Sequence, residues 1–169
     1  MLLNRTFTFV IAALMILCLT ATSVGKEIEG NARVNGKIYG TDVKLTTAKF
    51  DGSILEIYEG DSWGQNPSLL IFLFDDAKLV APNKSIKIKP SSKSAPHVHA
   101  RFKPKGQENV KTKVFMDDYS MTIRFQKPKR GFLPAKFELS EPNGKTKVEG
   151  FFFLKQEKAK NQGGSKSRR

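Results

Sequence analysis

The segment from His97 to Lys103 reads His-Val-His-Ala-Arg-Phe-Lys and carries the side chains best suited to chemistry in this sequence. Alternate side chains of a strand point to opposite faces, so Val98, Ala100 and Phe102 are expected on an apolar face. The opposite face would carry His97, His99, Arg101 and Lys103. Arg offers paired hydrogen bonds and Lys a point charge, so such a face suits phosphate, sulfate or carboxylate groups.

Three neighbouring segments have the same alternation and extend this polar face. Apolar Ile86 and Ile88 alternate with lysines, as do Val114 and Met116, while a hairpin turn at 117–120 would bring the next strand alongside. If these strands are neighbours in one sheet, the predicted ligand-binding surface consists of Lys87, Lys89, His97, His99, Arg101, Lys103, Lys113 and Arg124. The competing interpretation is that these are ordinary solvated side chains, scattered over the surface.

A metal site is an alternative use of the two histidines. His97 and His99 have the spacing with which one strand offers two imidazoles to copper or zinc, and with Met116 or Met121 they could suit copper in an exported β-sandwich. The alternation argues against it, because it places Met116 in the core and adds two cations beside the histidines. We therefore expect no metal and no cofactor.

A sugar site is the second alternative. The loop 60–68 contains the only tryptophan, Trp63, with Asp61, Gln65 and Asn66 around it. An indole face can stack on a sugar ring while carboxylates and amides bind its hydroxyls, which would make the chain a carbohydrate-binding or adhesion domain. A tryptophan that covers the end of the β-fold is the simpler explanation.

The sequence does not predict an enzyme. It has no P-loop, dinucleotide-binding fingerprint or zinc-protease HExxH motif, and the only cysteine, Cys18, lies in the N-terminal segment. We expect no catalytic residues.

The first 25 residues are typical of a secretory signal peptide. Arg5 precedes an apolar run from Phe7 to Leu19, which is shorter than the roughly 18 residues that span a bilayer. Small residues follow, so cleavage is expected after Ser23 or Gly25. The predicted location is therefore periplasmic or secreted.

Charge defines the expected partners. The chain has 29 Lys plus Arg against 16 Asp plus Glu, a net charge of +13, of which signal removal takes only Arg5. Such an excess favours anionic partners. We expect a non-enzymatic module that binds an anionic envelope or extracellular polymer or glycan. A membrane surface or lipopolysaccharide is the alternative anionic partner, and nucleic acid is disfavoured.

Short alternating runs separated by turn residues about every ten positions predict an all-β fold of about ten antiparallel strands. A β-sandwich, Ig-like or jelly-roll-like, is the expected architecture, with a closed barrel as second choice. The expected organisation is a signal peptide over 1–25, a single domain over 26–155 and a disordered basic tail over 156–169. The expected strands are 32–39, 43–50, 54–58, 69–74, 84–89, 97–103, 111–116, 121–126, 135–139 and 145–154.

Overall fold

The computed structural model describes residues 28–60 and 67–156. It contains ten strands and one short 3-10 helix. The strands are β1 (Ile28–Ile38), β2 (Thr41–Phe50), β3 (Ile54–Tyr58), β4 (Ser68–Phe72), β5 (Ser85–Ile88), β6 (His97–Phe102), β7 (Lys111–Phe115), β8 (Ser120–Phe125), β9 (Phe132–Ser140) and β10 (Lys147–Lys155); the helix η1 (Phe74–Leu79) follows β4.

All ten strands belong to one antiparallel sheet in the order β5-β8-β9-β10-β1-β2-β3-β4-β6-β7. The expected all-β antiparallel fold is confirmed. The expected sandwich is not confirmed, because one continuous hydrogen-bonded order joins all strands instead of two separate packed sheets. The closed barrel is not observed either, since β5 and β7 end the order and do not pair with each other.

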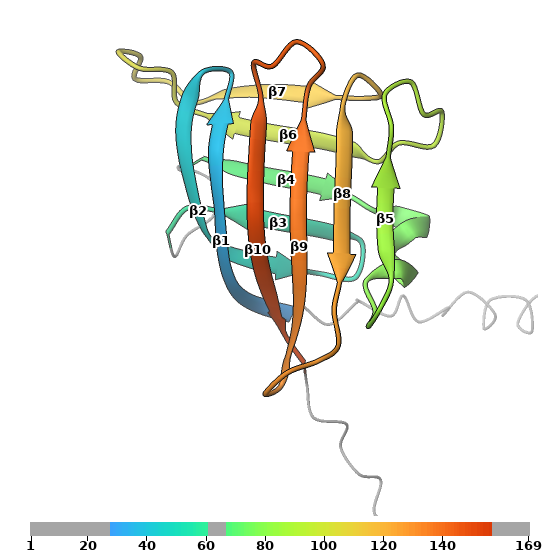
Figure 1. Ribbon diagram of the computed structural model, residues 1–169. Coiled ribbons are helices and arrows are strands. Elements are labelled where there is room, and N and C mark those ends of the chain that lie inside the picture. Colours follow the sequence, from blue (N-terminus) through green and yellow to red (C-terminus); the bar gives the residue numbers. More distant parts are fainter. Residues whose placement is uncertain (1–27, 61–66, 157–169) are drawn as a thin grey trace, which may run out of the picture.

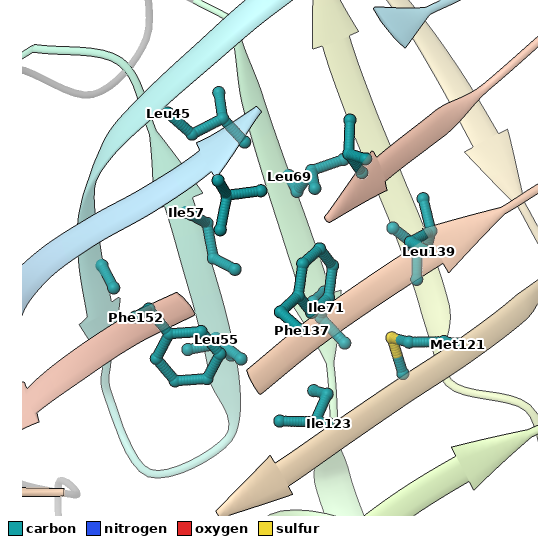
Figure 2. Packing of buried hydrophobic residues seen from close by; sticks show 14 of the residues in the cluster. Leu45, Leu55, Ile57, Leu69, Ile71, Met121, Ile123, Phe137, Leu139 and Phe152 are labelled. Carbon is teal, nitrogen blue, oxygen red and sulfur yellow. The ribbon is translucent and has the colours of Figure 1, made fainter. Parts of the chain in front are cut away.

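The sheet curls into a half-barrel around its own core. In Figure 1, β1, β10, β9, β8 and β5 run in front, while β3, β4, β6 and β7 cross behind them at a steep angle. Side chains from both halves fill the space between, as Figure 2 shows for Leu45 and Ile57 and for Phe137 and Leu139. Burial of this large apolar surface stabilises the fold without any disulfide.

Each of the ten expected strands has an observed counterpart, and β3 matches its expected range residue for residue. The fourth differs at its end, because Phe74 begins η1 instead of extending β4. No pattern in the sequence indicated this helix. Its partly buried Ala77 and Leu79 pack against the core and hold it in place.

The side chains of β7 that face the core are the opposite set from the one expected. Phe115 is fully buried, whereas Val114 and Met116 are 40% and 49% exposed. The expectation failed because Val114, Phe115 and Met116 are all apolar and therefore do not define a face. The aromatic ring takes the core position, where it packs against Tyr119 with 6.1 Å between ring centroids.

Three predicted features lie outside the described residues: the signal peptide, residues 61–66 of the loop that contains Trp63, and all but the first residue of the basic tail. These remain predictions from sequence. Within 28–60 and 67–156, no helix is long and apolar enough to cross a membrane.

Candidate functional site

The eight residues expected to form one basic surface separate into two groups. Lys87, Lys89 and Arg124 belong to β5 and β8 or the residue following β5, at one end of the sheet. The other five, which are His97, His99, Arg101, Lys103 and Lys113, belong to β6 and β7 or lie just after β6, at the other end. Six strands separate the two groups in the sheet order. The assumption that these strands are neighbours in the sheet is therefore wrong.

Within each group, the expected alternation mostly holds. Val98, Ala100 and Phe102 are buried, which confirms the apolar face of β6. Similarly, Ile86 and Ile88 are buried beside the exposed Lys87 and Lys89, and Arg124 is exposed between the buried Ile123 and Phe125.

Lys113 is the exception, because it lies on the core side of the edge strand β7. Its cross-strand partner in β6 is the buried Ala100, and its ammonium is 5.8 Å from the ring centroid of Tyr39. Hydrogen bonding to Tyr39, followed by electrostatic interaction with the same side chain, raises the pKa of Lys113. The Tyr39 hydroxyl in turn donates a 3.2 Å hydrogen bond to the buried Glu141. Lys113 thus interacts with Tyr39 on the core side of the edge strand β7.

His97 and His99 lie on the outer face of β6, as expected. His99 is paired with Leu70 of β4 and Val114 of β7, and its ring is 4.7 Å from that of Phe72. The surroundings of His99 are therefore largely apolar. In the described part of the chain, no group of three or more His, Cys, Asp or Glu residues could hold a metal ion.

A different set of cations comes together on the outer face of the front strands. Arg124 of β8 is paired with Lys136 of β9, Lys136 with Phe151 of β10, and Phe151 with Arg33 of β1. With strands about 4.8 Å apart, this row extends about 15 Å across the sheet. Lys147 lies on the same face of β10 as Phe151, four residues away along the strand.

We call this surface the cationic face and define it by Arg33, Lys87, Arg124, Lys136 and Lys147. The strands that carry these five residues, β5, β8, β9, β10 and β1, run in front in Figure 1. The five side chains are exposed. A depression of about 580 Å³ lies within it, lined by Arg33, Asn35, Gly36, Lys136, Lys147, Glu149, Gly150 and Phe151. An open depression with basic walls and one exposed ring can hold a chain-like anion against several cations at once.

Two carboxylates lie among these cations. Glu138 forms a 2.5 Å ion pair with Lys136. The hydrogen bond and charge of Lys136, with weaker contributions from Arg124 and Lys147, lower the pKa of Glu138. Glu149 lines the depression itself. The face keeps an excess of positive charge, since its five cations exceed these two acids.

The backbone of β1 and β10 shapes the depression. Gly36 and Gly150 have φ values of 148° and 155°. Gly36 of β1 lies so close to the backbone of β10, and Gly150 of β10 so close to the backbone of β1, that a Cβ atom at either position would collide with backbone atoms. A β-bulge also sets Ala32 and Arg33 of β1 opposite the single residue Thr46 of β2. Bulges bend a strand and redirect its side chains. Both features bend the sheet where Arg33 and the depression lie.

Sequence reasoning identified Lys87 and Arg124 but missed Arg33, Lys136 and Lys147. Their alternation with buried neighbours was visible in the sequence, for example Ala32-Arg33-Val34. The missing information was that β10 lies between β9 and β1, which brings these three cations together. Comparison with protein-family models, with curated proteins and with solved structures finds no match to this chain.

Proposed function

We propose that this protein is an exported, non-enzymatic module that binds an anionic polymer of the cell envelope or the extracellular space through the cationic face. The observation that carries this proposal is the cross-strand row of Arg124, Lys136 and Arg33, with the exposed Phe151 inside it. A polymer that lies across the strands would meet these cations in succession.

The arrangement favours a repeating anion over a single small one. The cations are spread along about 15 Å and around an open depression, so no single phosphate or sulfate could contact all of them. Each contact would be weak because exposed charges are screened by solvent and salt. When one polymer makes several such contacts, each bound site raises the effective concentration of the polymer at the next site. Sites that are weak individually therefore bind the polymer with higher overall affinity.

The basic sequence after residue 156 would strengthen the attraction of the polymer to the protein without determining where on the protein the polymer binds. It contains Lys158, Lys160, Lys166, Arg168 and Arg169 and only one acid, Glu157. All variants that test the cationic face must therefore retain the sequence after residue 156 unchanged.

The test compares two triple variants of equal charge on a heparin column. The first, Arg33→Gln with Arg124→Gln and Lys147→Gln, removes charge from the cationic face. The second, Lys78→Gln with Lys93→Gln and Lys105→Gln, removes the same charge from exposed positions elsewhere. Heparin is the probe because it is a soluble, linear, sulfated polymer.

We expect the original protein to be retained at low salt and released by modest salt, and the cationic-face variant to elute at clearly lower salt than the control variant. In titrations, the slope of log affinity against log salt concentration should fall by about one for each lost contact. Equal elution of the two variants would refute the assignment to this face. Absence of any retention at low salt would refute polyanion binding altogether.

A further inference from the structure

A second concavity lies where β4 ends and β6 begins. It has a volume of about 280 Å³ and is lined by Phe72, Leu73, Phe74, Asp75, Asp76, Ser94, Ala95, Pro96 and His97. Two stretches of chain form it: the end of β4 with the start of η1, and the loop that leads into β6. We call it the aromatic pocket.

Phe74 is the most unusual residue of the aromatic pocket. Its side chain is 62% exposed, the largest exposure among the big apolar side chains described, and its φ is 40°. The left-handed region costs a residue with a Cβ about 1–2 kcal/mol, and a bulky residue rarely adopts it. Exposure also forfeits most of the stabilisation that a buried phenyl group would supply. Packing within the protein does not explain why a phenylalanine stands here.

Backbone hydrogen bonds hold Phe74 in this position. The amide groups of Leu73 and Phe74 both donate to the carbonyl oxygen of Ser53, at 2.8 and 3.3 Å. Ser53 is itself fixed by Asp51, whose carboxylate accepts hydrogen bonds from the Ser53 amide and hydroxyl groups. The pocket wall is therefore preorganised by the turn that connects β2 with β3.

The rings at the pocket form a short series. The centroids of Phe74 and Phe72 are 5.9 Å apart, and the ring of Phe72 is 4.7 Å from that of His99. His97, the cross-strand partner of Phe72, completes the lining on the β6 side. Phenyl faces are partly negative and attract a cation placed over them.

The charge of the lining has the opposite sign from that of the whole chain. Among the described residues that line the pocket, Asp75 and Asp76 are acidic and none is Lys or Arg, although the chain carries a net charge of +13. Acids in the first turn also favour η1 itself. That local role does not require two phenyl rings beside them at an open pocket.

We propose that the aromatic pocket binds a small molecule that carries a compact organic cation, an alkylammonium group. Phe72 and Phe74 would contact the alkyl and cationic surface of the group, and Asp75 and Asp76 would supply the opposite charge. This proposal is independent of the cationic face, which lies on other strands and attracts the opposite charge.

The test uses choline and its neutral carbon isostere, 3,3-dimethylbutan-1-ol. The two probes have nearly the same shape and differ in charge. Binding is followed by chemical-shift changes of backbone amides in the ¹⁵N-labelled protein, so that its location is read directly. We expect choline to produce saturable shifts confined to residues 72–76 and 94–99, with an affinity about three to thirty times that of the isostere.

Three variants assign the binding to the proposed groups. Phe74→Ala should weaken choline binding by about threefold or more, and Asp75→Asn combined with Asp76→Asn should lower the preference for choline over the isostere, leaving only the contribution of the rings. Phe151→Ala removes the exposed ring of the cationic face and should leave choline binding unchanged. Because Phe74 and Phe151 are both exposed, neither variant disturbs the core.

The outcomes separate clearly. Equal affinity for choline and the isostere would overturn the proposal by showing an apolar pocket without cation selectivity. Shifts spread over the protein, or no saturation at high choline concentration, would overturn it by showing no defined site. Unchanged binding by Phe74→Ala would overturn the role of the rings. None of these results bears on heparin retention, so the two proposals fail separately.

Discussion

Replacement of Gly150 by alanine should disrupt the contact between β1 and β10 that shapes the cationic face. An added Cβ at this position would lie 2.0 Å from the Arg33 carbonyl oxygen and 2.8 Å from the Val34 Cα. Ordinary contacts begin at about 3.4 Å, so the two strands would have to separate by about 1.4 Å. The obstacle is backbone in the middle of the sheet, and no flexible side chain can move away to relieve it.

The expected destabilisation is about 3–5 kcal/mol. Separation by this distance breaks the adjacent hydrogen bonds between β1 and β10, worth about 1 kcal/mol each. It also loosens the packing of the neighbouring Val148 and Phe152 in the core, and it adds the cost of a Cβ at a φ of 155°. This is a large share of the 5–15 kcal/mol that stabilises a typical domain.

Urea unfolding followed by circular dichroism measures the effect, and Gly144→Ala is the matched control. Gly144 also has a positive φ, 72°, but nothing lies within 4 Å of an added Cβ. The control should therefore lose only about 1 kcal/mol. A Gly150→Ala protein as stable as the Gly144→Ala protein would refute the close-approach argument. A control that folds while Gly150→Ala does not would support it.

Three further substitutions test how polar side chains contribute to stability, and urea unfolding measures the free energy of unfolding of each variant. Burial opposes ionisation of Asp51, but hydrogen bonds from the turn lower its pKa overall. The ionised carboxylate therefore stabilises the fold above the unfolded pKa of about 4. This stabilisation is lost as the pH falls through the pKa of the folded state. Asp51→Asn should thus be less stable at pH 7 by under about 1 kcal/mol, given solvent screening, and equally stable at pH 2; a difference that persists in acid would contradict this. Burial raises the pKa of Tyr119, and its protonated hydroxyl donates a hydrogen bond to the Pro96 carbonyl oxygen. Tyr119→Phe should therefore lower the free energy of unfolding by about 1–2 kcal/mol. An unchanged stability would show that this hydrogen bond contributes nothing. The buried Ser68 hydroxyl has no hydrogen-bond partner, so Ser68→Ala should be neutral or stabilising by up to about 1 kcal/mol, and a clear loss would indicate an unseen partner.

Local sequence patterns predicted the strands well but could not predict their order. Alternation and turn residues located all ten strands because these signals act within a few residues. The position of β5 beside β8, and of β10 beside β1, depends on contacts between distant parts of the chain. The choice between two sheets and one curled sheet depends on the same contacts. No pattern within 32–39 or 145–154 specifies that these segments pair.

The candidate sites show the same limit. Arg124 was identified, but its neighbours Lys136 and Arg33 come from strands that the sequence does not place beside it. In β7, a run of three apolar residues left the face undetermined, and Lys113 was assigned to the wrong side. The aromatic pocket was missed because Phe74 looked like the last residue of a strand, whereas the left-handed φ that exposes its ring results from hydrogen bonds to the distant Ser53.

The pairing of β1 with β10 joins the first strand of the described chain to the last, with Gly30 opposite Leu154. During synthesis, the edge of β1 that pairs with β10 stays uncovered until β10 leaves the ribosome, so this sheet forms only after residue 155 has been made. Such long-range closure slows folding. The same adjacency makes the protein a good subject for circular permutation: a short linker between the two ends, with new termini in an exposed turn such as the one at Gly144, should preserve the sheet.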